Sequence, residues 1–471
     1  MREPDERPID EEEGDRLLGA LIGTDASPSM LVLAVSGGVD SMALMHLAAD
    51  AVRRAGRGRI LVATVDHGLR AESAAEASFV AAEAHRIGLA HAMLPWRGGK
   101  PETGIQEAAR AARYGLLAEA YHRQPATTKW LVTAHTADDQ AETVLMRLAR
   151  GSGVEGLSGM AETERLQIAP DRQHLPPVAL ARPLLGVPKT RLVATMRARG
   201  LQWIEDPSNE SLAFERVRIR QAMPALVAIG LAREALCRTA RRMRTVRRTL
   251  AQLTRRALTD PDLVLVDPLG FVVIDRRAWT DEAAGLGEAV QLRLLAAVVR
   301  MVGGMDRPVS LASLEEVGWR ISTGWHSLPA PSYAVTLGHT RIEQTAAGVT
   351  IVREAGRRPP EPVVLQPGAE ALWDNRFHVR LAVDAPAPLA VRALGQIGMR
   401  ALAEDGRCPP SAPSAALVSV PAFFDGERLV AVPSLAEHWR RLDPAAAARH
   451  AAALEGPCSA VFQDARLASD E

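Results

Sequence analysis

Short apolar runs alternate with amphipathic stretches between about residues 30 and 205 of this 471-residue chain. The apolar runs, rich in Val, Leu and Ile, predict buried strands at 30–37, 59–68, 91–96 and 130–135. Apolar residues at helical spacing predict helices at 41–55, 73–88, 105–123 and 138–149. This alternation predicts an α/β fold, a doubly wound parallel sheet covered by helices on both faces.

The pattern changes near residue 212, where a basic helical segment begins and continues to about 258. Its charge is almost purely arginine, and its apolar stripe consists of Leu236, Met243, Leu250 and Leu253. Strand-like segments follow, with a helical piece near 287–301, and the proline-rich segment 356–362 is typical of a linker. We therefore expect four parts, which are an acidic N-terminal extension (1–28), an α/β domain (29–222), a central, largely helical basic domain (223–355) and a small, divergent C-terminal domain (363–471).

Composition narrows the class of protein. Lys and Arg number 56, as do Asp and Glu, so only the distribution of charge can point to a partner. The cysteines Cys237, Cys408 and Cys458 lie far apart without a C-x-x-C pair, which argues against a disulfide framework, a zinc site and an iron–sulfur cluster. The acidic N-terminus is the reverse of a signal peptide, and no apolar run is long enough to span a bilayer. We expect a cytoplasmic protein that is not bound to a membrane.

Polar residues follow three of the predicted strands, at Ser36–Ser41, at Asp66-His67 and at His135–Asp139. In a parallel sheet the carboxyl ends of the strands meet at the edge where ligands bind. All three groups are therefore expected at one site.

The segment SGGVDS, residues 36–41, joins the first strand to the first helix of this region. Free backbone N–H groups and the positive end of the helix dipole bind phosphate at such a turn. Gly37 and Gly38 let the backbone approach an anion, and Ser36 and Ser41 add hydroxyl donors. Asp40 would repel phosphate unless it holds a Mg²⁺ ion that bridges to the phosphates. The G-x-x-x-x-G-K-[ST] pattern is absent from the sequence, which argues against a P-loop enzyme that transfers a γ-phosphate.

SGGVDS resembles the pyrophosphate loop of the N-type ATP pyrophosphatases, which adenylate a substrate and release pyrophosphate. Further motifs narrow this resemblance, namely VDHGLRAES (65–73), IQEAARAARYGLL (105–117), VTAHTADDQAETVLMRLARGSGVEGLSGM (132–160), RPLLGVPKTRL (182–192) and WIEDPSNESLAFERVRIR (203–220). In this order and spacing they closely resemble the tRNA(Ile)-lysidine synthases over about residues 30–220. The similarity is looser afterwards. Thr136 stands where that family often has His or Asn, and Val217 replaces a frequent Asn.

The resemblance implies a PP-loop domain of the adenine nucleotide alpha hydrolase type and an ATP-dependent ligase. Such a ligase joins L-lysine to C2 of the wobble cytidine in the CAU anticodon of an isoleucine tRNA. The reaction passes through an adenylated base and yields lysidine, AMP and pyrophosphate, so that the tRNA reads AUA instead of AUG. ATP and Mg²⁺ are the implied cofactors, that tRNA and lysine are the implied partners, and a homodimer is compatible with the resemblance.

Site residues follow from these motifs and from the chemistry. The predicted ATP-binding residues are Ser36, Gly37, Gly38, Val39, Asp40, Ser41, Asp66, His67 and His135, with Asp40 also the predicted Mg²⁺ ligand. A lysine amine, with a pKa near ~10.4, must lose a proton before it attacks, so a carboxylate is needed beside it. Asp139 and Glu142, three apart on one helical face, are the candidates. The predicted catalytic residues are thus Asp40, Asp139, Glu142 and Arg113, and the predicted tRNA-binding residues are Arg110, Arg216, Arg220, Arg241, Arg244 and Arg248.

Each motif also has a purely structural interpretation. HTADDQAET can be a helix N-terminus with Asp138 as its cap and Asp139 favoured by the helix dipole. A metal site formed by His135, Asp138 and Glu142 is a further alternative. The arginine-rich segment can be a solvated or internally paired helix face, and it can equally contact a polyanion.

Two other functions remain open at the level of sequence. One is a tRNA thiolase of the same superfamily, but such enzymes usually carry a cysteine pair near the site, and the first 230 residues contain no cysteine. The other is a catalytically silent tRNA-binding protein with an inherited nucleotide fold. The intact SGGVDS and DDQAET motifs argue against a silent protein.

Overall fold

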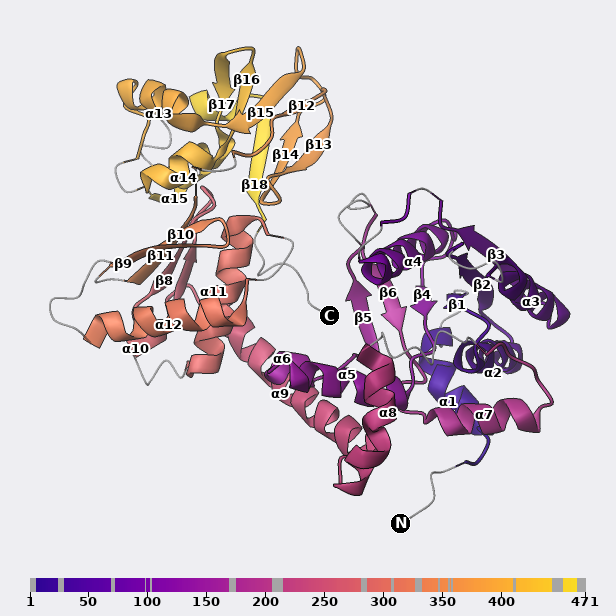
Figure 1. Ribbon diagram of the computed structural model, residues 1–471. Coiled ribbons are helices and arrows are strands. Elements are labelled where there is room, and N and C mark those ends of the chain that lie inside the picture. The colour runs from indigo at the N-terminus through magenta and orange to yellow at the C-terminus, as the bar shows by residue number, and fades with distance from the viewer. Residues whose placement is uncertain are drawn as a thin grey trace. The chain divides into compact units, whose positions relative to one another are not determined.

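A computed structural model describes residues 6–23, 29–68, 73–97, 99–101, 104–168, 175–205, 215–280, 286–305, 309–326, 333–345, 348–354, 356, 359–409, 412–442 and 452–463. The chain divides into two compact units, residues 1–247 and 248–470 (Figure 1). No helix in the described ranges is both long enough and apolar enough to cross a membrane.

The first unit is built on a six-stranded sheet with the order β3-β2-β1-β4-β6-β5. Its strands are β1 (Met30–Ala34), β2 (Arg59–Asp66), β3 (Ala90–Pro95), β4 (Lys129–Val132), β5 (Thr163–Leu166) and β6 (Val178–Ala181). Neighbouring strands are parallel except β5 and β6, which are antiparallel at one edge. The four strands expected from the sequence are β1 to β4, and the parallel sheet is confirmed.

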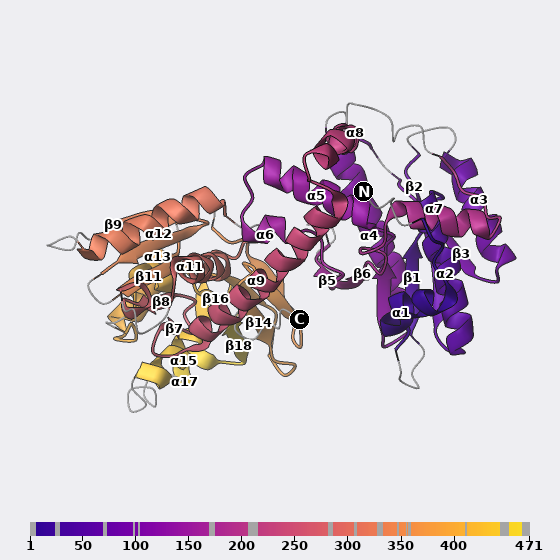
Figure 2. The ribbon, with the colours of Figure 1, turned by 90° about the horizontal axis from the view of Figure 1, so that it is seen from below.

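Helices cover both faces of this sheet (Figure 2). They are α1 (Glu11–Ile22), α2 (Val39–Ala55), α3 (Ser73–Arg86), α4 (Ile105–His122), α5 (Ala137–Ala149), the short α6 (Val154–Leu157), α7 (Lys189–Ala198) and α8 (Glu215–Ala228), and α9 (Arg233–Thr259) runs on into the second unit. Helices α1, α2, α3 and α7 share one buried apolar core, and α4 packs on the other face in a second core. Two covered faces explain why the strands read as continuous apolar runs.

The acidic N-terminal segment contributes α1 to this unit. Leu18 and Leu21 of α1 are buried in the same core as α2. The acidic side chains are paired, Asp15 with Arg54 of α2 at 2.7 Å and Glu13 with Arg191 of α7 at 2.7 Å. The limits of the predicted extension, 1–28, stay a prediction.

The order in which successive strands are added to the sheet changes side at β1. Strands β2 and β3 lie on one side of β1, and β4 lies on the other. In open α/β sheets, ligands bind at the carboxyl edge where the strand order changes in this way. Helices α2 and α5 both begin at this edge. It brings together SGGVDS and HTADDQAET, which are about 100 residues apart in sequence.

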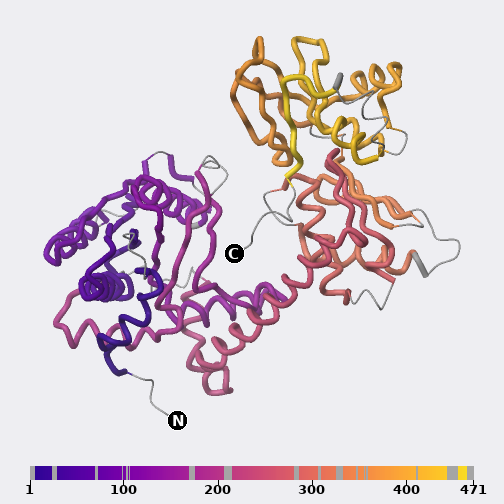
Figure 3. Tube along the Cα trace, turned by 180° about the vertical axis from the view of Figure 1, so that it is seen from behind, coloured from indigo at the N-terminus to yellow at the C-terminus, as the bar shows by residue number. Residues whose placement is uncertain are grey.

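Helices α8 and the first half of α9 lie along α5 (Figure 3). Leu236 and Ala240 of α9 form a small buried core with Ala141 and Val144 of α5, and Met223 of α8 packs against it. Leu236 is thus buried as the expected apolar stripe requires, whereas Leu253 remains 39% exposed. The basic helix is fastened to the helix that carries the DDQAET motif.

The second unit contains a five-stranded antiparallel sheet with the order β7-β8-β11-β10-β9. It is formed by β7 (Val264–Val266), β8 (Val272–Asp275), β9 (Tyr333–Leu337), β10 (Thr340–Gln344) and β11 (Gly348–Arg353), with α10 (Arg277–Thr280), α11 (Glu288–Gly303) and α12 (Leu311–His326). The region expected to be largely helical thus combines these helices with a complete sheet, in the segments that read as strand-like.

The remainder of the second unit carries two smaller sheets, ordered β12-β15-β16-β17 and β13-β14-β18. The elements are β12 (Val363–Leu365), β13 (Glu370–Trp373), β14 (Phe377–Leu381), β15 (Leu389–Ala393), α13 (Gly395–Glu404), α14 (Ser414–Ser419), β16 (Pro421–Asp425), β17 (Arg428–Ala431), α15 (Pro433–Leu442), α17 (Ala452–Glu455) and β18 (Cys458–Phe462). One apolar core contains Ile351, before the proline-rich segment, and Trp373 and Phe377 after it. The predicted boundary at 356–362 stays a prediction.

Candidate active site

The loop between β1 and α2 has the geometry of an anion-binding turn. Gly37 has φ of +91°, and a Cβ atom there would lie 2.8 Å from Cδ1 of Ile204, so both the backbone and the space require glycine. The Gly37 carbonyl accepts the Ile204 N–H at 2.9 Å. Gly38 is the N-cap of α2 and has no side chain that could occupy the first N–H groups of the helix. The helix therefore presents these donors to a ligand.

The two serines of the loop hold its shape. The Ser41 hydroxyl donates to the Gly38 carbonyl at 2.9 Å and accepts the Ser36 N–H at 3.1 Å. The hydroxyl oxygens of Ser36 and Ser41 lie 3.4 Å apart. Ser36 is exposed at the mouth of the loop, and Val39, the first residue of α2, is buried beneath it. All six residues of SGGVDS are thus in place around one turn.

Asp40 lies in the first turn of α2 with one carboxylate oxygen unsatisfied. Its Oδ2 is 3.6 Å from Nζ of Lys189, whereas its Oδ1 is buried and has no hydrogen-bond partner among the described residues. Burial raises the pKa of Asp40 to about 6, with the Lys189 ammonium opposing this and the nearby carboxylates of Asp139 and Asp138 adding to it. Among the described residues, this carboxylate pairs with one cation, Lys189, and its second oxygen can accept another.

The start of α5 is a capping box. The Thr136 hydroxyl accepts the Asp139 N–H at 3.4 Å, and Asp139 Oδ2 accepts the Thr136 N–H at 2.8 Å. The structural interpretation of this motif placed Asp138 at the cap, but the N-cap residue is Thr136. Asp138 Oδ2 accepts the backbone N–H of Lys189 at 2.8 Å and Asp138 Oδ1 pairs with Arg233 at 3.2 Å. Thr136 caps the helix because its hydroxyl is three residues before Asp139, which leaves Asp138 free to join α5 to α7 and α9.

Glu142 lies one turn further along α5 and is 3% exposed. Its Oε1 accepts a hydrogen bond from Nε of Arg220 at 2.9 Å, while its Oε2 is buried without a hydrogen-bond partner within the described part of the chain. Burial raises the pKa of Glu142, although Arg220 acts in the opposite sense. Arg220, predicted to bind tRNA, therefore also neutralises a buried carboxylate.

His135 follows β4 and lies between these acids and a group of arginines. Its Nδ1 is 2.9 Å from the Thr133 hydroxyl. Burial, opposed by the charge of Asp139 and assisted by the positive charges of Arg182, Arg113 and Arg216, lowers the pKa of His135 to about 4. The imidazole is therefore neutral at neutral pH.

Arginines from two different helices, α4 and α8, gather near this edge. Arg110 and Arg113 of α4 lie over the ring of Tyr114 at 5.1 and 5.3 Å. Arg216 of α8 acts electrostatically on both His135 and Glu142. Arg110, Arg113 and Arg216 thus form a positive flank to the acidic edge.

Asp66 and His67 occupy the end of β2. Asp66 Oδ1 accepts the Gly68 N–H at 2.8 Å and the Ser73 hydroxyl at 2.7 Å, and these hydrogen bonds lower the pKa of Asp66. The ring of His67 lies edge-on to Trp96, with centroids 6.0 Å apart. Burial and the charge of Arg113 lower the pKa of His67. A neutral imidazole and an indole at this point offer apolar faces on which a base can stack.

The three arginines predicted along α9 differ in their surroundings. Arg241 and Arg248 are exposed. Arg244 is only 12% exposed and donates to the Met160 carbonyl at 2.8 Å, with Glu162 3.7 Å away. Within the described ranges, the structural interpretation, an internally paired arginine, thus fits Arg244, whereas no ion pair joins Arg241 or Arg248 to a described residue.

Comparisons with known proteins bear on this site. A PP-loop domain family matches residues 11–226. The chain is 39% identical to tRNA(Ile)-lysidine synthase of Ruegeria pomeroyi over 88% of this chain and 90% of that one. It is 48% identical to the protein of the same name from Methylobacterium nodulans (66% and 86% covered) and 41% identical to that from Bradyrhizobium diazoefficiens (76% and 95% covered).

The chain belongs to the tRNA(Ile)-lysidine synthase family. Among solved structures, it is similar over 49% of its length to the U34-tRNA thiolase NcsA from Methanococcus maripaludis, which it covers to 78%, with 15% identity and a TM-score of 0.41. A likeness this weak has no bearing on function.

Three residues at the edge of this lysidine synthase family member were not singled out from the sequence. Ile204 closes over Gly37, Lys189 faces Asp40, and Arg182 is 4% exposed beside Ala161 and Glu164. All three lie in quoted motifs, RPLLGVPKTRL and WIEDPSNESLAFERVRIR. The signal available for Lys189 was its place directly after Pro188 within the quoted motif RPLLGVPKTRL. Residues 69–72 and 206–214 of the family motifs lie outside the described residues.

A magnesium ion fits the donors that this edge offers. Mg²⁺ prefers carboxylate oxygens and commonly uses only one or two of them, together with phosphates and water. Asp40 supplies one unsatisfied buried oxygen, and the described residues contain no cluster of three or more His, Cys, Asp or Glu side chains that would form a complete protein cage. The site therefore suits a Mg²⁺ ion that is bound mainly by the phosphates of ATP and by water, with Asp40 as its protein ligand.

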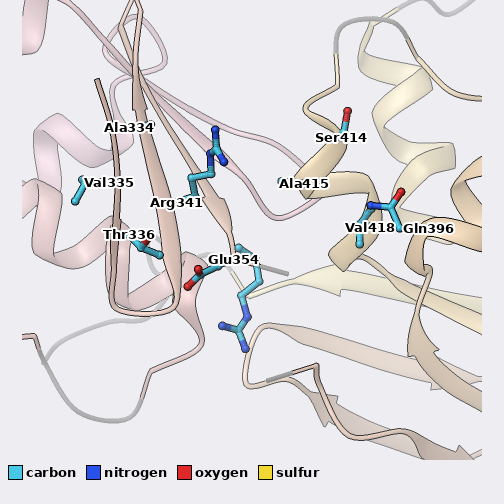
Figure 4. Close-up of a pocket in the computed structure, with 10 residues that line it drawn as sticks. Ala334, Val335, Thr336, Arg341, Glu354, Gln396, Ser414, Ala415 and Val418 are labelled. Carbon is cyan, nitrogen blue, oxygen red and sulfur yellow. The ribbon is translucent and has the colours of Figure 1, made fainter. Parts of the chain in front are cut away.

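A cavity of about 400 Å³ lies elsewhere, in the second unit (Figure 4). It opens between the β9–β11 sheet and α14, and Arg341, Glu354, Gln396 and Ser414 are among the residues that line it. None of the predicted site residues contributes to this cavity.

The first prediction concerns Asp40→Asn, measured in EDTA. The folded-state pKa of Asp40, about 6, lies above the ordinary value of 3.8, so the folded state binds the proton more tightly. The contribution of Asp40 to stability is therefore lost as pH rises from about 4 to about 6. Asn removes the buried charge, and at pH 7.5 we expect the free energy of unfolding to increase by up to about 3 kcal/mol.

Urea unfolding at pH 7.5 and at pH 4.5 tests this expectation. The gain should shrink at pH 4.5, where the folded wild type carries a protonated Asp40. An Asn variant that is less stable than the wild type at pH 7.5 would contradict the view that the buried charge of Asp40 destabilises the metal-free protein.

Proposed function

We propose that this protein ligates L-lysine to C2 of the wobble cytidine in the CAU anticodon of an isoleucine tRNA, with ATP as the source of AMP. The observation that carries the proposal is the meeting, at one sheet edge, of the SGGVDS loop, the carboxylates of α5 and the arginines of α4 and α8. Membership of the lysidine synthase family supports it over nearly the whole chain.

The first chemical step activates a poor electrophile. The C2 oxygen of cytidine attacks the α-phosphorus of ATP, the bond from that phosphorus to the bridging oxygen breaks, and pyrophosphate leaves. The N–H groups at the start of α2 and the hydroxyl of Ser36 hold the leaving pyrophosphate in line, while the Ser41 hydroxyl, which donates to the Gly38 carbonyl, keeps the loop in shape. A Mg²⁺ ion bound by Asp40 would supply neutralisation of its negative charge.

The second step forms the carbon–nitrogen bond. The lysine ε-amine, once deprotonated, attacks C2, the C2–O bond breaks, and AMP departs with the former carbonyl oxygen. Asp139 Oδ2 already accepts two hydrogen bonds from Thr136, whereas Glu142 Oε2 has no hydrogen-bond partner among the described residues. We assign acceptance of the ammonium proton to Glu142, whose raised pKa suits it to the task, and orientation of lysine to Asp139.

The positive flank serves the nucleic acid and the adenylate. Arg113 stands close enough to both His67 and His135 to lower the pKa of each, so its guanidinium can neutralise the phosphate of the transferred AMP. Arg110 and Arg216 beside it meet the anticodon backbone. The neutral imidazoles of His67 and His135 add no charge and are suited to stacking and hydrogen bonding with a base.

The cysteines give no support to a thiolase. Cys237 is the one cysteine in the sequence of the first unit, and its Sγ–H donates to the Ala137 carbonyl at 3.3 Å. Burial raises the pKa of this thiol to about 11, which suppresses the thiolate that sulfur transfer needs.

The second prediction is the reaction itself. Purified protein with radiolabelled lysine, ATP and tRNA transcripts should label the CAU-anticodon isoleucine tRNA and should spare the methionine tRNA with the same anticodon. One AMP and one pyrophosphate should form for each lysine. Production of ADP, incorporation of sulfur instead of lysine in an extract, or tRNA binding without AMP formation would each reject the proposal.

The third prediction separates exposed from buried arginines of α9. Each phosphate contact that is lost should flatten the log–log dependence of tRNA affinity on salt by roughly one unit or slightly less. Arg241→Ala combined with Arg248→Ala should weaken tRNA binding and flatten this slope, because both side chains are exposed. ATP affinity should not change.

Arg244→Ala is the matched control on the same helix. Its guanidinium is held by the Met160 carbonyl, so its loss should leave the salt slope as in the wild type. An unchanged slope in the double variant would show that α9 does not grip the phosphate backbone. The C-terminal region, with Arg392, Arg400 and Arg407, would then be the next candidate.

A further inference from the structure

Lys189 places an ammonium group beside the pyrophosphate loop. It is the first residue of α7, and its Nζ lies 3.6 Å from Asp40 Oδ2. The side chain is 45% exposed and the Asp40 side chain 25% exposed, so the pair sits at the mouth of the loop and not beneath it. An exposed ion pair of this kind is weak, so the Lys189 ammonium can leave the Asp40 carboxylate and bind another anion.

The backbone of Lys189 is fixed, whereas its side chain is half exposed and held by Asp40 alone among the described residues. The Lys189 N–H donates to Asp138 Oδ2 at 2.8 Å, and the Ala137 N–H donates to the Val187 carbonyl at 2.9 Å. These bonds tie the start of α7 to the start of α5. The ammonium is thus delivered to one place at the end of a flexible four-carbon stem.

The charge balance of this edge calls for a cation there. Asp138 and Asp139 lie close enough to Asp40 to raise its pKa, and the incoming ligand is a polyanion. A helix N-terminus offers only about half a positive charge. SGGVDS itself contains no cation, in contrast to loops in which a lysine precedes the final serine or threonine.

The residue type also fits an exchangeable contact. Lys189 is one of three lysines in a chain that carries 56 Lys and Arg in all. An arginine would pair with Asp40 through a rigid two-pronged contact, whereas lysine is a compact point charge with rotatable donors.

We propose that the Lys189 ammonium joins the N–H groups of α2 in holding the departing pyrophosphate, and that Asp40 keeps this ammonium at the loop until the phosphates and their metal arrive. Metal and ammonium thus compete for Asp40 in the free enzyme, and on binding the ammonium moves from the carboxylate to a phosphate oxygen. This inference rests on the proposed function, since it takes ATP cleavage between the α- and β-phosphates as given.

The test compares two small ligands that occupy different ends of the ATP site. Inorganic pyrophosphate with Mg²⁺, and AMP by itself, are titrated by calorimetry into the full-length wild type and its Lys189→Met and Lys189→Arg variants. Loss of a charge-assisted hydrogen bond should weaken pyrophosphate binding by about 10- to 100-fold in Lys189→Met. AMP affinity should stay as in the wild type, and Lys189→Arg should recover most of the pyrophosphate affinity.

A matched control removes a lysine of the same unit that is distant from the loop. The Lys129 ammonium lies over the Tyr121 ring at 5.0 Å and donates to the Gln124 carbonyl, so Lys129→Met should bind both ligands normally. A third titration, of Mg²⁺ alone, should show binding to Lys189→Met that is no weaker than to the wild type, because the competitor for Asp40 is gone.

The outcomes separate the inference from the proposed function. Unchanged pyrophosphate affinity in Lys189→Met would overturn the inference, and so would equal loss of pyrophosphate and AMP binding, which would indicate a structural role. Weaker binding of Mg²⁺ alone would overturn the competition for Asp40. A wild type that forms no lysidine would instead remove the proposed function.

Discussion

Three carboxylates share one partly buried edge, and much of the first unit serves to keep them there. Asp40 begins α2, and Asp138 and Asp139 lie in the first turn of α5. A helix N-terminus stabilises an acid by only about 0.3–1 kcal/mol, which is too little to offset the burial that raises the pKa of Asp40 to about 6. The remaining compensation comes from specific partners, a threonine hydroxyl for Asp139, Arg233 for Asp138 and Lys189 for Asp40.

The opposite sign of charge is gathered a short distance away. Burial keeps His135 neutral, with Asp139 opposing this and Arg113, Arg182 and Arg216 adding to it. The edge therefore has an acidic side, which attracts a metal and its phosphates, and a basic side, which attracts a nucleic acid backbone. A reaction in which pyrophosphate departs one way and AMP is passed to a base needs both sides within one site. Glu142, held by Arg220, stands where the two sides meet.

The sequence predicts the parts of this arrangement that depend on local pattern. Four apolar runs with helices between them allow few folds besides a parallel sheet, and SGGVDS and DDQAET fall where strands end, so their convergence follows from topology. The position of Lys189 does not follow, because it depends on a backbone hydrogen bond to Asp138, 51 residues earlier. Arg241 and Arg244 look equivalent in sequence, yet the carbonyls of Ser158 and Met160 take up Arg244. The carbonyl groups that bind Arg244 belong to a segment more than 80 residues earlier, so nothing in the sequence of α9 identifies which arginine they will bind.

The central claim is that this edge passes AMP to the oxygen of the target base before lysine attacks. Isotopic labelling of that oxygen tests the claim most directly. An isoleucine tRNA that carries ¹⁸O at the C2 carbonyl of the wobble cytidine is converted with lysine and unlabelled ATP, and the AMP is examined by mass spectrometry. The account predicts that the label appears in the phosphate of AMP and is absent from pyrophosphate. Unlabelled AMP formed alongside lysidine would contradict it, because the C2 oxygen would then have left without being adenylated.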